Sequence, residues 1–274
     1  MSGGLSGKEI RLSKLFSGDR NAVIVAVDHG QTFGPLEGLT RFTEAVERLG
    51  EADGVLLAPQ MVRFSGRLFR GSGSPALIVR LNWNTIHCEP WDYQEADTVQ
   101  GFSVPAAVSV GADVVLASLT LRTGSEKRDA RNVRLFAQLA EESRGLGMPL
   151  IGEVFPPGGL RTRPDAFHDY TRSACRIACE LGADAIKTFY TGDRFGEVTG
   201  GVPIPVFALG AEKLEHEIDA LRLARDAVDG GARGVVFGRN VVQARSPAHF
   251  LRALKDVVKA GATPEEASTH LEAP

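Results

Sequence analysis

Eight short apolar runs recur along the chain, and each is followed by a longer amphipathic stretch. The runs are rich in β-branched residues and stay apolar at successive positions, so both of their faces are suited to burial. Strands of this kind occur in parallel sheets covered by helices, and eight strand–helix units indicate a closed (β/α)8 (TIM) barrel. The predicted strands are Ala22–Val27, Gly54–Leu57, Ala76–Leu81, Asp113–Ser118, Pro149–Val154, Asp184–Lys187, Ile204–Ala208 and Arg233–Phe237.

A repeated glycine signal separates the predicted helices from the strands. The segments Val110–Asp113, Leu181–Asp184 and Gly230–Arg233 each carry a glycine where a helix must end and the chain must turn into a strand. An open doubly wound sheet is the alternative architecture, but no Gly-x-Gly-x-x-Gly sequence follows the first strand. The repeats therefore favour the barrel.

The length of 274 residues is close to that of one α/β barrel, and the composition does not change sharply along the chain. We therefore expect a single domain over residues 1–274, with the barrel at about 20–258 and a C-terminal extension at 259–274. The extension is expected to pack outside the barrel or against a neighbouring subunit. Lys8–Phe16 is expected to close the lower end of the barrel.

Charge and hydropathy exclude several classes of partner. The net charge is −3, and the scattered lysines and arginines form no basic stretch for nucleic acid or an anionic membrane. No segment approaches the roughly 20 apolar residues of a membrane span, and the first residues lack a signal-peptide core. Cys88, Cys175 and Cys179 are too few for a disulfide framework, and the last two share a helix face typical of packing. We expect a cytoplasmic protein that binds small molecules.

Polar residues close several predicted strands, at the end of a barrel where reacting groups are found. Lys187 follows Ala185 and Ile186 at the end of a buried strand. Burial disfavours the ammonium form, so we expect a lowered pKa and a neutral amine that can attack a carbonyl. The alternative is a structural lysine paired with Asp28 or Glu153.

Asp28 and His29 directly follow the first strand. An aspartate at the barrel mouth is suited to orienting substrate hydroxyls or a catalytic water. The alternative is that Asp28 caps the next helix and His29 only packs. Neither a His-x-x-x-His sequence nor a spaced cysteine set accompanies them, so we expect no metal.

The ends of the last two strands resemble a phosphate site. Gly210-Ala211 and Gly238-Arg239 each follow a strand with a glycine that can expose backbone N–H groups. Barrels commonly bind phosphate in these two loops, at a helix N-terminus, and Arg239 would add a bidentate cation. The alternative is an arginine that simply faces solvent.

Three motifs in the same order resemble those of the archaeal-type class I fructose-bisphosphate aldolase family: Val27–Gly30, Lys187 with Tyr190–Asp193, and Gly238–Val241. That family includes aminodideoxyheptulosonate synthase and the thiolase that cleaves phosphorylated autoinducer-2 products. The resemblance covers about residues 10–255. It implies a Schiff base on Lys187, a role for Asp28 at the substrate hydroxyl or carbinolamine, a phosphate at Gly210, Gly238 and Arg239, no cofactor, and a homo-oligomer.

One departure from the family concerns proton transfer. Where the sugar-phosphate aldolases carry Tyr-Pro-Arg-Gly, with the tyrosine as general acid/base, this chain has Phe155-Pro156-Pro157-Gly158. A phenyl ring cannot transfer a proton. Glu153 shares the face of Phe155 in a strand, and we expect it to exchange protons near neutrality instead. Tyr190 and His29 are the alternatives.

Asn82 and Trp83, after the third strand, are bulkier than the small residues expected there, and are predicted to line and narrow the substrate pocket. We therefore expect a substrate other than fructose 1,6-bisphosphate. The favoured function is an aldolase or transaldolase acting through Lys187 on a phosphorylated sugar or related carbonyl compound. The alternatives are a thiolase-like acyl transferase on a phosphorylated diketone and a phosphate-ligand binding protein without catalysis.

Overall fold

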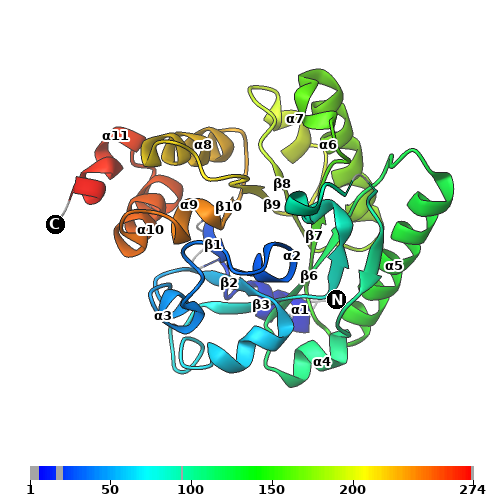
Figure 1. Cartoon of the computed structure of the whole chain (residues 1–274), viewed down its shortest axis with the longest axis horizontal. Helices are drawn as coiled ribbons and strands as arrows, with labels where there is room; N and C mark the ends of the chain where they lie inside the picture. Colours follow the sequence, from blue (N-terminus) through cyan, green and yellow to red (C-terminus); the bar gives the residue numbers. More distant parts are fainter. Residues whose placement is uncertain (1–5, 17–20, 94, 273–274) are drawn as a thin grey trace, which may run out of the picture.

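All eight apolar runs form parallel strands that close into a barrel, in the order β1-β10-β9-β8-β7-β6-β3-β2 (Figure 1). The computed structural model describes residues 6–16, 21–93 and 95–272. The predicted (β/α)8 barrel is therefore confirmed, and the open sheet is excluded. The barrel strands are β1 (Ala22–Ala26), β2 (Gly54–Leu57), β3 (Ala76–Arg80), β6 (Val114–Leu119), β7 (Leu150–Val154), β8 (Ala185–Phe189), β9 (Val206–Leu209) and β10 (Gly234–Phe237).

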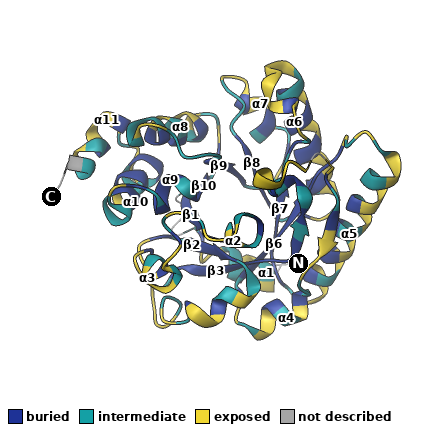
Figure 2. Cartoon of the chain, in the orientation of Figure 1, coloured by how far each residue is buried: buried dark blue, intermediate teal, exposed yellow. Residues whose placement is uncertain are grey.

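Helices surround the barrel, so the strands are buried on both faces while the outer helix faces are exposed (Figure 2). Cys175 and Cys179 are free thiols on α6. No helix in the described ranges is long and apolar enough to span a bilayer. The main outer segments are α3 (Phe42–Glu47), η2 (Pro59–Phe64), α4 (Val104–Ser109), α5 (Glu126–Gly145), α6 (Pro164–Glu180), α7 (Phe195–Thr199), α8 (Glu217–Asp229) and α10 (Pro247–Lys255). Shorter segments are α1 (Gly7–Leu12), α2 (Gly30–Phe33), η3 (Thr85–His87), η4 (Glu89–Trp91), η5 (Leu160–Thr162), α9 (Arg239–Val242), η6 (Asp256–Ala260), α11 (Pro264–Ala267) and η7 (Ser268–Glu272).

The barrel interior is apolar in its lower part and polar at its upper end. In β3, Ala76 and Ile78 belong to the inner apolar cluster, as Ala185 does in β8. Side chains alternate between the two faces of a strand, so the next inward positions are Arg80 and Lys187. The alternation that places apolar side chains in the lower barrel therefore also places charged side chains near the carboxyl ends of its strands.

Aspartates at the start of strands fasten the lower ends of the barrel together. Asp113 accepts a hydrogen bond from the backbone N–H of Leu77 at 3.0 Å, and Asp184 accepts one from Leu150 at 2.9 Å. Gly182 precedes this aspartate with a φ of 108°, a conformation that favours glycine. The Gly-Ala-Asp repeats thus combine a helix stop with a link to the neighbouring strand.

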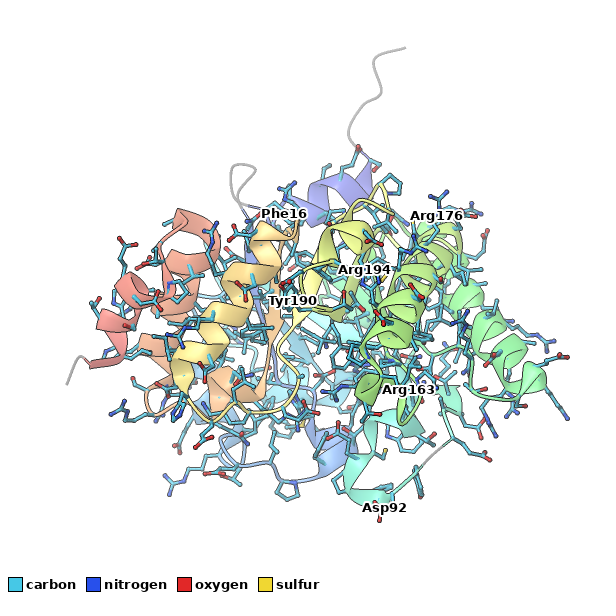
Figure 3. The ribbon with its side chains drawn as sticks, turned by 90° about the horizontal axis from the view of Figure 1, so that it is seen from above. Phe16, Asp92, Arg163, Arg176, Tyr190 and Arg194 are labelled. Carbon is cyan, nitrogen blue, oxygen red and sulfur yellow. The ribbon has the colours of Figure 1, made fainter. Side chains whose placement is uncertain are left out.

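The segment after α1 closes the lower end of the barrel, as expected for Lys8–Phe16. Leu15 is fully buried within the inner apolar cluster, and Phe16 stacks on Phe207 with ring centroids 5.7 Å apart. Figure 3 shows Phe16 at the end of the molecule opposite to Asp92, which lies in the loop that follows η4. Ligands must therefore enter the barrel from the carboxyl ends of the strands.

Replacing Leu15 with alanine is expected to lower the free energy of unfolding by about 2 to 5 kcal/mol, because it leaves a cavity under the barrel. Chemical denaturation of both proteins would measure the difference. Ile10 is a matched control, because its side chain is largely exposed and Ile10→Ala should cost far less. Equal losses in the two variants would contradict the closing role of Leu15.

The C-terminal extension forms α11 and η7, which pack against α8 and α10 outside the barrel. A capping box fixes the start of α11, in which Thr263 accepts from the N–H of Glu266 and the Glu266 side chain accepts in return. The extension therefore lies on the outer helical layer, away from the barrel mouth.

Candidate active site

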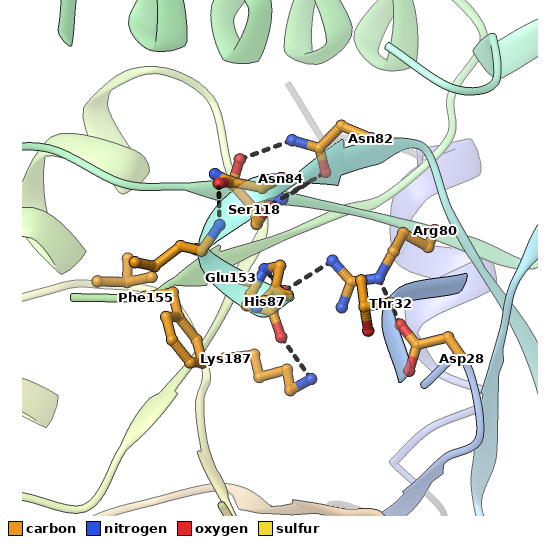
Figure 4. A network of polar contacts seen from close by, with 12 residues as sticks. Asp28, Thr32, Arg80, Asn82, Asn84, His87, Ser118, Glu153, Phe155 and Lys187 are labelled. Carbon is orange, nitrogen blue, oxygen red and sulfur yellow. Dashed lines mark hydrogen bonds and ion pairs between the residues drawn. The ribbon is translucent and has the colours of Figure 1, made fainter. Parts of the chain in front are cut away.

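Four buried charged residues form a chain of ion pairs at the carboxyl ends of β1, β3, β7 and β8 (Figure 4). Lys187 Nζ lies 2.5 Å from Glu153 Oε1, and Arg80 Nη1 lies 2.8 Å from Glu153 Oε2. Arg80 also pairs with Asp28 through its Nε. Glu153 and Lys187 are register partners on the adjacent strands β7 and β8, so the backbone itself holds this pair together.

The cluster is electrically balanced, with two cations and two carboxylates. Burial alone would raise the pKa of Asp28, but the nearby charges of Arg80 and then Lys187 outweigh it and lower this pKa. Burial also opposes ionisation of Glu153, yet Arg80, Lys187 and His87 hold its pKa well below the ordinary value. Both carboxylates are therefore ionised at neutral pH.

This result corrects the expectation that Glu153 titrates near neutrality. That expectation balanced two effects on the pKa of Glu153. Apolar surroundings raise it, and the single positive charge of Lys187 lowers it. Arg80 supplies a second cation on the other carboxylate oxygen, and the balance moves to the ionised form. Glu153 is thus a fixed anion beside Lys187, as in the alternative in which Lys187 pairs with Glu153.

Sequence reasoning alone does not single out Arg80, which is the centre of this network. The available signal is an arginine at the end of the apolar run Ala76–Leu81. Burial of an unpaired guanidinium would cost several kcal/mol, so an arginine inside a barrel strand implies carboxylate partners nearby. Asp28 is one of them and does not cap α2, whose N-cap residue is His29 without a side-chain capping bond.

His29 lies beside the cluster, against the β10 end. Burial, with smaller effects from Lys187 and Arg239, lowers the pKa of His29 to about 4 although Asp28 opposes the shift. Its imidazole is therefore neutral at pH 7. A Cβ atom at Gly238 would lie 2.3 Å from Cε1 of His29, so only glycine leaves room for this ring.

Arg239 faces the same cavity from the start of α9. Its guanidinium lies 5.3 Å from the ring centroid of Phe33, and its Nη1 is 3.6 Å from Glu89 Oε2. The Nε atom is buried and has no hydrogen-bond partner among the described residues. Arg239 therefore lines the cavity and is mostly shielded from bulk solvent.

The loop after β9 is held in place by Asn240, which is fully buried. The Asn240 side chain donates to the carbonyl of Gly210 at 2.8 Å and accepts from the N–H of Leu214 at 2.9 Å. Within this loop Ala211 has a φ of 49°, a strained conformation that costs about 1 kcal/mol or more. The two loops predicted to bind phosphate are thus tied to each other.

Aromatic and charged groups frame the mouth of the cavity. The ring of Phe155 contacts Phe189 on the next strand, with ring centroids 5.0 Å apart. Arg161 stacks over Phe189 and makes two hydrogen bonds to Glu212, at 2.7 and 2.8 Å. Sequence reasoning does not identify Arg161 or Glu212, because Arg161 lies in the short η5, Glu212 lies in the loop after β9, and 51 residues separate them.

One cavity of about 670 Å³, including its open mouth, collects most of the predicted site residues. Within the described parts of the chain, no group of three or more His, Cys, Asp or Glu side chains is arranged to hold a metal. The predicted residues that line the cavity are Asp28, His29, Glu153, Phe155, Lys187, Gly210, Ala211, Gly238 and Arg239.

Three predicted residues lie elsewhere. Tyr190 points away from the barrel and packs on Phe195 of α7, with ring centroids 5.3 Å apart. Asn82 and Trp83 belong to β4 (Asn82–Asn84), which leaves the barrel to pair with β5 (Thr98–Gln100). Asn82 makes two 2.8 Å hydrogen bonds to the backbone of Ser118, and Trp83 lines a neighbouring cavity. Their expected positions in the Lys187 pocket are therefore corrected.

Comparisons with known proteins agree with this arrangement. The sequence pattern of DeoC/LacD family aldolases matches residues 22–244. An uncharacterized aldolase of Saccharolobus solfataricus is 33% identical over 268 residues, which span 95% of this chain and 97% of that protein. The 3-hydroxy-5-phosphonooxypentane-2,4-dione thiolase of Yersinia pestis is 31% identical over 261 residues, 92% of this chain and 82% of that enzyme.

Solved structures give the same result. A Schiff-base-forming fructose-1,6-bisphosphate aldolase superposes with a TM-score of 0.77 at 30% identity, covering 92% of this chain and 99% of the other. An archaeal fructose-1,6-bisphosphate aldolase, solved with its catalytic lysine covalently bound to the carbinolamine intermediate, gives 0.77 at 29% identity over the same shares.

Proposed function

The chain belongs to the DeoC/LacD family of aldolases, and from this premise we propose that it cleaves or forms a carbon–carbon bond through an imine on Lys187. The observation that carries the proposal is the position of this amine. Lys187 is buried in the middle of β8, and it is the one lysine that lines the cavity within the described residues. An amine in such a site is protected from water and directed at any carbonyl bound beside it.

The neighbouring charges fit the steps of imine formation. Lys187 attacks the carbonyl as a neutral amine, and the Glu153 carboxylate, 2.5 Å away, holds its nitrogen in position. After water leaves the carbinolamine, the positive iminium lies beside the same carboxylate, which stabilises it. Asp28, ionised and fixed by Arg80, is positioned to accept hydrogen bonds from substrate hydroxyls.

The substrate class is a phosphorylated carbonyl compound. Arg239 lines the cavity, and a phosphate accepts two hydrogen bonds from one guanidinium. The names of the relatives point to phosphorylated compounds as well. Phe155, without a hydroxyl, favours a substrate or proton path different from that of the fructose-bisphosphate enzymes.

Acyl transfer to a thiol is the second candidate, and the observation that favours it is the 31% identity to a phosphodiketone thiolase. Both candidates share the lysine, the carboxylates and the phosphate loops. They differ in whether a thiol accepts the cleaved fragment. Coenzyme A dependence of cleavage would therefore distinguish them.

Borohydride reduction in the presence of a panel of sugar phosphates and keto acids tests the proposal. Borohydride fixes an imine as a stable secondary amine, so we expect a mass increase on the peptide that contains Lys187. The keto compound that gives the most adduct identifies the substrate class. A phosphate-binding protein without catalysis would give no adduct with any member of the panel.

Replacing Arg239 with alanine is expected to raise KM for a phosphorylated substrate by about 10- to 100-fold, because a charge-assisted contact to the phosphate is lost. The KM for the matching unphosphorylated compound should change little. Steady-state kinetics with both compounds would measure the change in KM for each. Arg194→Ala is the control, because Arg194 pairs with Glu197 outside the cavity. Equal losses for both compounds would contradict a phosphate contact.

A further inference from the structure

The cavity lacks an obvious group to move a proton at carbon. Carbon–carbon bond chemistry through an imine requires a base that takes a proton from the substrate and an acid that returns it. Phe155 carries no hydroxyl, Tyr190 lies outside the cavity, and Glu153 is held as a fixed anion by two cations. Some other side chain must serve.

His87 lines the cavity beside Phe155. It is the last residue of η3, and its ring meets Phe155 edge to face with centroids 4.5 Å apart. Its Nε2 lies 3.4 Å from Oε2 of Glu153 (Figure 4). The other carboxylate oxygen of Glu153 contacts Lys187. The side chain is 14% exposed and lines the cavity. His87, Glu153 and Lys187 therefore follow one another along the cavity wall.

The backbone beneath His87 is fixed, although the residue lies in a long loop. Asn84 is fully buried, and its side-chain oxygen accepts from the N–H of Ile86 at 3.0 Å, which caps η3. The β4–β5 hairpin is in turn fastened to β6 by Asn82, through the backbone of Ser118. These contacts give the imidazole a defined position, as proton transfer requires.

We propose that His87 is the acid/base group that moves the proton at the carbon next to the imine. The inference rests on the proposed imine at Lys187. In the forward step, neutral Nε2 takes the proton from the α-carbon. The C–H electron pair forms the enamine C=C bond, and the C=N π electrons return to the Lys187 nitrogen. The reverse step returns the same proton, so no further reactant is needed.

His29 and Asp28, which also line the cavity, are less suited to this step. His29 has a pKa of about 4 because of its burial, so it is a weak base near neutrality. Asp28 is ionised and occupied by Arg80. The Nε2 atom of His87 is buried and has no hydrogen-bond partner among the described residues, and the charged group that faces it is Glu153.

The test uses dihydroxyacetone phosphate in deuterated water, with two readouts on the full chain. Borohydride adducts measure the imine, and NMR measures exchange of the α-proton for deuterium. In His87→Gln we expect adduct formation within a few-fold of the unmodified protein and exchange slowed by about 100-fold or more. His270→Gln is the matched control, because His270 pairs with Asp256 outside the barrel; it should change neither readout.

Two further variants exclude a merely structural role. In His87→Ala, free imidazole in the buffer should restore part of the exchange rate. In the double variant His87→Gln with Phe155→Tyr, the phenol would take the place beside the imine that the family gives to tyrosine, and exchange should recover. Undiminished exchange in His87→Gln, or loss of exchange that neither imidazole nor tyrosine restores, would overturn the inference. Absence of an adduct in the unmodified protein with dihydroxyacetone phosphate and with every other compound of the panel would overturn the imine on Lys187, and this inference with it.

Discussion

Replacing Lys187 with alanine is expected to lower kcat by about 10⁴-fold or more, because the variant has no amine to form the imine. The fold should persist, since Glu153 keeps its second cation, Arg80. Turnover of the compound that gives the most borohydride adduct would measure the loss. Circular dichroism and thermal unfolding would verify that the variant is folded.

The matched control for this substitution is Lys213→Ala. Lys213 lies in the loop after β9 and does not line the cavity, so its removal should leave kcat within about two-fold. Peptide mapping of the adduct completes the test. An adduct on Lys213 or Lys255, or normal turnover by Lys187→Ala, would contradict the assignment of the nucleophile.

Replacing Arg80 with methionine is expected to lower the free energy of unfolding by about 3 to 5 kcal/mol at pH 7, because Asp28 and Glu153 lose their shared cation while remaining buried. Methionine is close to the arginine stem in length, so lost packing contributes little. Activity should fall as well, since the carboxylates then compete for Lys187. Urea denaturation and steady-state rates would measure both effects.

The pH dependence of this loss identifies its cause. In the unmodified protein the pKa values of Asp28 and Glu153 are lowered from 3.8 and 4.5. Their ion pairs therefore stabilise the fold above about pH 4.5, and this contribution is lost as the pH falls through the lowered values. In Arg80→Met the carboxylates take up protons more readily, so the difference in stability between the two proteins should narrow from pH 7 to pH 4. An equal difference at both pH values would indicate lost packing instead.

The sequence predicts the barrel well because burial on both faces leaves a local signal in each strand. The same alternation predicts which strand-end residues point inward, and Glu153 and Lys187 follow from it. Gly210 and Gly238 follow from the position of phosphate loops in barrels. These parts of the site depend on position within one strand or one loop.

The remaining parts depend on contacts between distant segments. Arg80 on β3 reaches past β6 to Glu153 on β7, and this pairing lowers the pKa of Glu153 where a value near neutrality was expected. Asn82 and Trp83 lie outside the barrel because β4 pairs with β5. No local sequence pattern predicts this hairpin. His87 lies in the connection between β4 and β5 and contacts Phe155, which is far from it in the sequence. Contacts of this kind are set by tertiary packing rather than by the sequence around each residue.

The closed lower end of the barrel has a consequence for how this fold can change its chemistry. Leu15 and Phe16 seal the amino ends of the strands, and Asp113 and Asp184 link those strands to their neighbours. Barrel closure is therefore secured at the end remote from Lys187. Exchanges of mouth residues, such as a tyrosine for Phe155, alter reactivity without weakening the links that hold the strands together. The residues that hold the barrel closed are therefore different from the residues that line the substrate cavity.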